Sequence, residues 1–161
     1  MADVLTAEQR RLNMSRIGGK DTKPEMLIRR GLHARGLRYR LHDRKLPGRP
    51  DLVFPRYGAV VFVHGCFWHA HGCALSKLPA TRQEFWQHKL AENAARDRRA
   101  IEALCADGWR VLVVWECALR GRWRRIEDDV VAALASGIRS GTRSLLEFTG
   151  RDDKKAKTEN E

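Results

Sequence analysis

The chain has 161 residues, of which 43% are hydrophobic and 32% are charged, a balance that is ordinary for one globular domain and excludes wholesale disorder. Its net charge of +11 at pH 7 is far from ordinary and indicates a polyanionic partner. No apolar run approaches the roughly 20 residues of a membrane span, and no signal peptide opens the sequence, so we expect a cytoplasmic protein without a membrane partner.

The N-terminal segment, residues 1–20, is expected to be a flexible basic arm that is partly helical between Ala7 and Ile17. The basic excess is concentrated near this end, because residues 1–50 hold 13 Lys and Arg against 5 Asp and Glu. Such polarised charge favours nucleic acid, since Lys and Arg displace counterions from phosphates. A solvated basic surface is the main alternative, and an acidic membrane surface is a weaker one.

A helix is predicted from Pro24 to about Arg35. Thr22 followed by Glu25 three residues later fits a capping box, and Gly36 ends the helix. Three strands bounded by turn-forming residues are predicted next, at Leu37–Leu41, Asp51–Phe54 and Ala59–His64.

The second half of the chain predicts a long helix from Thr81 to about Ala106, with Thr81 as its cap and Glu84 completing a capping box. A strand at Trp109–Trp115 and a helix from about Trp123 to Ala135 follow. This order predicts an α/β fold in which helices cover both faces of a mixed central sheet. We expect one domain at residues 21–150 and a disordered charged tail at residues 151–161.

The stretch VHGCFWHAHGC, residues 63–73, crowds cysteines and histidines together. Structural zinc takes four thiolate or imidazole ligands in a tetrahedral arrangement. The most economical set is Cys66, His71, Cys73 and Cys117. His69 could replace His71, and spacing alone leaves both open. Cys105 lies on the apolar face of the long helix, where a buried cysteine is expected.

Asp51 opens one strand, His64 ends the next, and Glu25 lies in the first turn of the preceding helix. Each of these features is weak alone. Together with a basic arm, they suggest metal-assisted hydrolysis of a phosphodiester, in which Mg²⁺ binds carboxylate and backbone oxygens and an imidazole deprotonates the attacking water.

Five stretches closely resemble the very short patch repair (Vsr-type) DNA mismatch endonucleases. They are MSRIGGKDTKPE (14–25), LPGRPDLVFP (46–55), VHGCFWHAHGC (63–73), PATRQEFW (79–86) and WECALRG (115–121). The resemblance covers roughly residues 10–125. It implies a restriction-endonuclease-like fold and a Mg²⁺-dependent nick on the 5′ side of the thymine in a T:G mismatch. Such mismatches arise when 5-methylcytosine deaminates.

Carried over by residue, the resemblance makes Asp51 the central Mg²⁺-binding carboxylate and His69 the general base. His64 and Glu25 hold the hydrated metal through its waters. Where restriction-type sites carry an acidic ligand, this chain has Val63, so only the backbone carbonyl of Val63 can bind the metal there. The valine also removes the hydrogen bond that a hydroxyl side chain could make.

The resemblance assigns structural zinc to Cys66, His71, Cys73 and Cys117, which leaves His69 for catalysis. Phe67 and Trp68 could cap a small core beneath the zinc or insert into a base stack. The resemblance favours DNA intercalation by Phe67, Trp68 and Trp86. It further implies mismatch recognition by Lys89 and Asn93, which share a helix face with Trp86, and by Met14 from the opposite groove.

The expected protein is thus a nicking endonuclease with catalytic Mg²⁺ and structural Zn²⁺, acting as a monomer on double-stranded DNA with a T:G mismatch, at the nucleoid of a bacterial-type cytoplasm. Mismatch-repair proteins are candidate partners. One alternative is a zinc-stabilised, non-catalytic binder of distorted duplex. Another is a restriction enzyme that cuts both strands of paired DNA.

Overall fold

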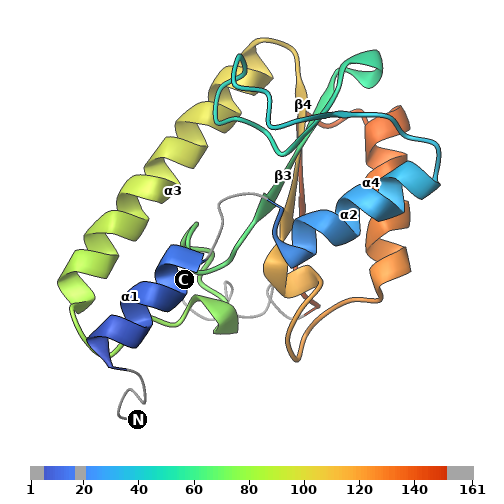
Figure 1. Cartoon of the computed structure of the whole chain (residues 1–161). Helices are drawn as coiled ribbons and strands as arrows, with labels where there is room; N and C mark the ends of the chain where they lie inside the picture. Colours follow the sequence, from blue (N-terminus) through green and yellow to red (C-terminus); the bar gives the residue numbers. More distant parts are fainter. Residues whose placement is uncertain (1–5, 17–20, 152–161) are drawn as a thin grey trace.

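The structure is a computed structural model that describes residues 6–16 and 21–151 (Figure 1). The described helices are α1 (Ala7–Arg16), α2 (Lys23–Ala34), α3 (Gln83–Ala106) and α4 (Glu127–Ser140). The described strands are β1 (Arg40–Leu41), β2 (Leu52–Phe54), β3 (Ala59–His64), β4 (Arg110–Trp115) and β5 (Leu145–Phe148). Within these residues no helix is both long and apolar enough to span a bilayer.

The strands form one mixed sheet in the order β1-β2-β3-β4-β5. β1, β2 and β3 are antiparallel neighbours, whereas β3, β4 and β5 run parallel. Parallel neighbours need long crossover connections, and α3 and α4 lie in these two connections. The expected α/β fold with a mixed sheet is therefore confirmed.

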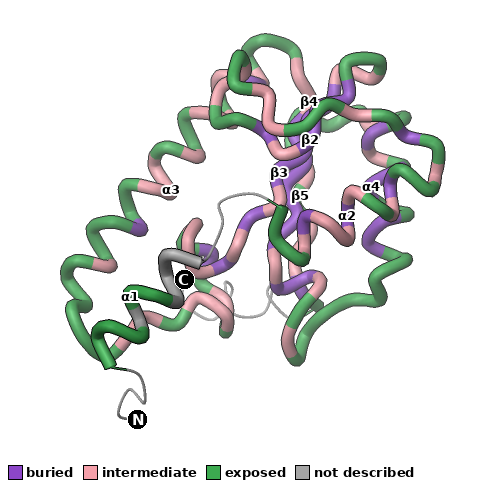
Figure 2. The backbone as a smooth tube through the Cα atoms, viewed as in Figure 1, coloured by how far each residue is buried: buried purple, intermediate pink, exposed green. Residues whose placement is uncertain are grey.

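Side chains alternate along β3, so each face of the sheet has its own core. Ala59 and Val61 pack in a cluster with α2 and α4, whereas Val60 and Phe62 pack in a second cluster with Leu104 of α3. Figure 1 shows α3 on one side of the sheet and α2 with α4 on the other. The strands between them are mostly buried, while the outer helix faces are exposed (Figure 2).

Only part of the predicted capping box is present at the N-terminus of α2. Thr22 is the N-cap, and its hydroxyl accepts from the backbone N–H of Glu25 at 3.4 Å. In a full capping box Glu25 would accept from the N–H of Thr22. Its carboxylate instead accepts from the N–H of Asp21 at 2.6 Å. The bond from Asp21 therefore holds the Glu25 side chain, which is only 2% exposed, at the N-terminal end of α2.

Other expected boundaries are wrong. The first strand contains only Arg40 and Leu41, and α3 begins at Gln83 with Arg82, not Thr81, as its N-cap. Arg82 has a left-handed backbone and makes no side-chain capping bond, so the N-cap position lies one residue after the predicted Thr81. The last helix begins at Glu127, and the edge strand β5 after it was not predicted.

The expected arm is helical over α1. The hydroxyl of Thr6 accepts from the N–H of Gln9 at 3.2 Å, and Gln9 Oε1 accepts from the N–H of Thr6 at 3.0 Å, a reciprocal cap at its start. Residues 1–5 and 17–20 of the arm, and 152–161 of the expected tail, lie outside the described residues.

Candidate active site and zinc cluster

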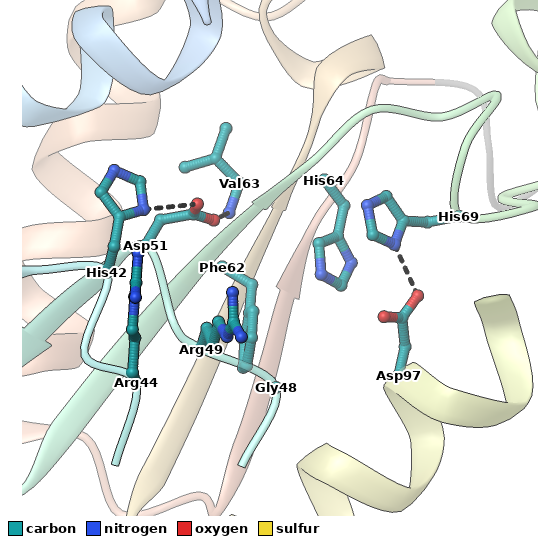
Figure 3. A pocket seen from close by; sticks show the side chains of 10 residues that line it. All are labelled: His42, Arg44, Gly48, Arg49, Asp51, Phe62, Val63, His64, His69 and Asp97. Carbon is teal, nitrogen blue, oxygen red and sulfur yellow. Dashed lines mark hydrogen bonds and ion pairs between the residues drawn. The ribbon is translucent and has the colours of Figure 1, made fainter. Parts of the chain in front are cut away.

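A cavity of about 520 Å³ lies beside β2 and β3, on the face of the sheet that α3 covers. Figure 3 shows the ten side chains that line it. Those able to exchange protons or bind a metal are His42, Asp51, His64, His69 and Asp97. The cavity therefore brings together three of the four residues predicted for catalysis, and adds two that were not predicted.

Asp51 directly precedes β2, and its side chain is only 17% exposed. Its carboxylate Oδ2 accepts a hydrogen bond from the backbone N–H of Val63 in β3 at 2.7 Å. Burial raises the pKa of Asp51 to about 6, against the lowering effect of the Val63 bond. A cation at this carboxylate would offset the cost of burying its charge.

Val63 lies beyond the last residue of β3 that pairs with β2, because that ladder ends at Leu52 and Val61. The backbone N–H of Val63 could donate to a backbone carbonyl of β2 if that strand were longer. It donates to the Asp51 side chain instead. The N–H and C=O of one strand residue point to the same side of the strand. The Val63 carbonyl therefore faces the side on which Asp51 lies.

His64, His69 and Asp97 form a second group. The rings of His64 and His69 are stacked, with centroids 3.8 Å apart and planes at 6°. His69 Nδ1 lies 2.5 Å from a carboxylate oxygen of Asp97, a residue of α3 (Figure 3). Burial, then the neighbouring His69, lowers the pKa of His64 to about 3, so His64 is neutral at neutral pH.

Glu25 lies near Asp51 but does not bond to it. Its Oε1 is 3.0 Å from His42 Nε2, although neither atom makes a hydrogen bond of good geometry. His42 Nδ1 in turn lies 3.8 Å from Asp51 Oδ1. His42 thus bridges two carboxylates, from a backbone with a φ of 47° that is uncommon outside glycine.

Four side chains after β3 and at the end of β4 form a compact metal-type cluster. They are Cys66, His71, Cys73 and Cys117, and their ligand atoms all lie within 4.8 Å of one another. His71 Nδ1 is 3.5 Å from the sulfur of Cys66 and 3.5 Å from that of Cys117. Tetrahedral zinc with ordinary bond lengths requires about 3.6 Å between sulfur and nitrogen ligands.

The environment of this cluster also fits a cation. Cys66 and Cys117 are buried, and the Cys117 side chain, followed by burial, raises the pKa of the Cys66 thiol. A thiolate at Cys66 therefore needs a nearby positive charge. The cluster is consistent with a zinc site, and its fourth member is His71, while His69 lines the cavity.

An aromatic cluster joins Phe67 and Trp68, which lie in the loop between Cys66 and Cys73, to Trp86 in the first turn of α3. Its ring centroids are 5.1 to 5.9 Å apart in edge-to-face contacts. Asn93 donates to the backbone carbonyl of Trp68 at 3.1 Å, and the Lys89 ammonium lies 6.0 Å from the Trp86 ring. The side chain of Met14 in α1 lies outside the described part of the structure.

Sequence reasoning missed His42 and Asp97. A signal for Asp97 was present, because it lies four residues after Asn93 on the helix face that also carries Trp86. His42 had no such signal. Its place beside Glu25 and Asp51 depends on the short β1 strand, whose partner β2 follows Asp51.

Comparisons with known proteins show the family of this chain. The sequence model of the family described as "DNA mismatch endonuclease Vsr" matches residues 2–75. The "Type II nicking enzyme V.XorIIP" of Xanthomonas oryzae pv. oryzae is 49% identical over 134 residues, which cover 80% of this chain and 98% of that protein.

Two further relatives are similar over most of their length. The "DNA mismatch endonuclease Vsr" of Escherichia coli is 49% identical over 138 residues, covering 86% of this chain and 88% of that protein. The "Type II nicking enzyme V.NmeAIP" of Neisseria meningitidis is 41% identical over 122 residues, covering 76% and 87%. With identities this high over nearly complete relatives, the chain belongs to the Vsr family of DNA nicking endonucleases.

Proposed function

We propose that this endonuclease nicks DNA on the 5′ side of the thymine in a T:G mismatch, the lesion left when 5-methylcytosine deaminates. Membership of the Vsr family and the name of the Escherichia coli relative, a DNA mismatch endonuclease, support this substrate. The observation that carries the proposal is the cavity that holds Asp51, His64, His69 and Asp97 together. The protein acts as a monomer on chromosomal DNA, with mismatch-repair proteins as candidate partners.

In this proposal Asp51 and the backbone carbonyl of Val63 hold a catalytic Mg²⁺. The fit rests on oxygen donors, which Mg²⁺ prefers, and on a buried carboxylate with a raised pKa that faces the cavity. When bound, Mg²⁺ stabilises negative charge on the attacking and leaving oxygens.

His69 is the proposed general base. The contact between its Nδ1 and Asp97 supports this role, because the carboxylate fixes the ring and leaves Nε2 to accept a proton from water. His64 stays neutral and stacks on His69, which keeps that ring in one orientation. The proposed contacts of His64 and Glu25 with waters of the hydrated metal complete the site, with His42 between Glu25 and Asp51.

Mismatch recognition is assigned to the aromatic cluster, with zinc at Cys66, His71, Cys73 and Cys117 stiffening its loop. Inserting rings between base pairs costs a few kcal/mol of stacking, and less beside a mismatch, so insertion favours the T:G site. Lys89 and Asn93 contact base edges from the same helix face, and Met14 enters from the opposite groove.

The test is a nicking assay with Mg²⁺ on end-labelled duplexes that carry one T:G pair in several methyltransferase-type sequence contexts, beside fully paired twins. The proposal expects a cut in the thymine strand only, next to the mismatch, and none in the twin. Asp51→Ala should abolish the cut while duplex binding remains.

Two other results would replace the proposal. Cutting of the paired twin indicates a nicking enzyme that reads sequence rather than a mismatch, a possibility raised by the names of several relatives. Tight binding of mismatched DNA without a cut by the unaltered protein indicates a non-catalytic binder, with Val63 the first residue to exchange for threonine.

A further inference from the structure

Two arginines line the catalytic cavity, and their guanidinium groups have no partner elsewhere in the described structure. Arg44 and Arg49 belong to the loop between β1 and β2, and Figure 3 shows both side chains among those of the cavity, near Asp51 and Phe62. Neither guanidinium makes a hydrogen bond, ion pair or ring contact with a described residue.

A lack of a side-chain partner among the described residues is common for the exposed arginines of this chain, as for Arg30 and Arg96. Arg44 and Arg49 differ from these arginines because they line the cavity. Two carboxylates, Asp51 and Asp97, line the same cavity as Arg44 and Arg49, yet both are paired elsewhere. The two guanidiniums therefore keep all their donors for another acceptor.

The loop that carries them is held in place. Leu46 packs into the core on the α3 side, and Arg49 donates its backbone N–H to the Leu46 carbonyl at 3.2 Å. Gly48 lies so close to Ala100 of α3 that an added Cβ would meet the Ala100 Cβ at 2.7 Å. Arg49 itself has a φ of 49°, a backbone conformation that is costly for a residue with a side chain and that is over-represented at active and ligand-binding sites.

The charge of the cavity indicates what these donors bind. A DNA strand that approaches Asp51 and Asp97 brings its own negative charge and is repelled unless cations are present. Arginine presents planar, paired donors that match two oxygens of a phosphate. We propose that Arg44 and Arg49 form a phosphate-binding pair that holds the strand to be nicked against Asp51 and His69, by contacting phosphodiesters next to the one that is cut.

This inference rests on the DNA nicking activity and on the proposed roles of Asp51 and His69. The arginines are positioning residues, because they contact neighbouring phosphates and leave the reacting atoms to Asp51 and His69. Their loss should weaken binding to mismatched and paired DNA alike, since a phosphate contact carries no base information.

The experiment compares Arg44→Ala, Arg49→Ala and the corresponding lysine variants with Lys45→Ala, a matched control. Lys45 is an exposed cation of the same loop that does not line the cavity. Equilibrium binding is measured without divalent metal over a salt series. Each alanine variant in the cavity should bind roughly ten-fold more weakly and lower the salt slope by about one unit, whereas lysine should restore much of the slope but not the affinity.

A second arm identifies the phosphates. Duplexes carry a neutral methylphosphonate at one backbone position at a time on either side of the expected nick. At the phosphate that Arg44 contacts, wild type and Arg44→Ala should bind equally well, while at every other position the variant should remain weaker. Arg49 should give the same result at its own phosphate. Thermal midpoints should match wild type, because neither side chain has a partner among the described residues.

Equal penalties for Arg44→Ala and Lys45→Ala, or a penalty that no methylphosphonate removes, would overturn the inference. The binding experiments need no catalysis, so they test the phosphate contacts of Arg44 and Arg49 even if a T:G mismatch is not the substrate. Failure of wild type to nick T:G duplexes would instead count against the proposed function.

Discussion

Asp51 shows how one residue couples stability to activity. Burial raises its pKa from 3.8 to about 6, so the folded protein binds a proton at Asp51 more tightly than the unfolded chain does. The contribution of Asp51 to the free energy of unfolding is therefore greatest below pH 3.8 and is lost as the pH rises through 6. The ionised carboxylate destabilises the metal-free fold by up to about 3 kcal/mol at pH 8.

Asp51→Asn should consequently stabilise the metal-free protein at pH 8, because a neutral amide can still accept from the Val63 N–H without a buried charge. The gain should shrink between pH 6 and pH 4, where the wild-type carboxyl is itself neutral. Urea unfolding at several pH values measures it. A loss of stability at pH 8 would show that burial of Asp51 is not costly in this site.

The same pKa predicts how the nicking rate falls on the acid side of the pH–rate profile. In the proposed mechanism Asp51 binds Mg²⁺ only when ionised, so the single-turnover rate at low Mg²⁺ should fall as the pH drops below about 6. Because the proton and Mg²⁺ compete for one carboxylate, more Mg²⁺ should move this midpoint to lower pH. A midpoint that does not respond to Mg²⁺ would assign this fall in rate to a different group.

Asp97 is expected to affect the chemical step alone. Asp97→Asn removes the carboxylate beside His69 Nδ1 and should lower the single-turnover nicking rate roughly 10²- to 10⁴-fold while duplex affinity changes little. Glu92→Gln on the same helix is the control, because Glu92 is exposed and pairs only with His88 among the described residues. Equal rates for both variants would remove Asp97 from the mechanism.

At the scale of elements, the segment between β3 and α3 combines the zinc-type cluster with the aromatic cluster. Cys66 lies directly before Phe67, and Cys117 joins this loop to the end of β4. Ser76 ties the segment further, since its hydroxyl donates to the Cys66 carbonyl at 3.0 Å. In the proposed insertion into DNA, such a support would keep the large rings ordered while they enter the base stack.

Cys73→Ser should release zinc and lower the free energy of unfolding by about 3 kcal/mol or more, as loss of a structural metal does. Cys105→Ser is the control, because Cys105 makes a single hydrogen bond to the Ser144 carbonyl outside the cluster. Metal analysis and thermal unfolding measure both effects. Unchanged metal content in Cys73→Ser would exclude Cys73 as a ligand.

At the scale of the whole molecule, the proposed function gives the net charge of +11 and the aromatic cluster different contributions to the free energy of DNA binding. Phosphate neutralisation supplies affinity without sequence information, whereas insertion at a weakened stack supplies preference for the mismatch. The overall affinity for DNA and the preference for the mismatch should therefore respond differently to salt.

We expect the affinity for mismatched and for paired duplex to fall steeply and in parallel between 50 and 200 mM salt, by roughly 10³-fold if six or more phosphates are contacted. The ratio of the two affinities should stay nearly constant. Trp68→Ala should reduce this ratio without changing the salt slope. A ratio that collapses with salt would mean that mismatch preference is electrostatic.

Several features were determined by the amino-acid sequence alone because their causes are local. Apolar periodicity and turn residues placed β3 at Ala59–His64 without error, and the Thr22 cap placed the start of α2 within one residue. Cysteine and histidine spacing narrowed the zinc-type set to three cysteines with His69 or His71. The resemblance to the Vsr family selected His71 and named the residues around Asp51. Apart from Cys117, which lies 44 residues after Cys73, the patterns of β3, α2 and the zinc-type set depend on neighbours within a few positions or within one loop.

Only the tertiary structure decided the rest. β5 is half exposed and gains its place from parallel pairing with β4, about 34 residues earlier in the chain, so its own sequence carries little signal. His42 meets Glu25 and Asp51, and Asp97 meets His69, because α2, β1, β2 and α3 converge on one cavity. Such contacts join residues far apart in the chain, and no local periodicity or spacing records them.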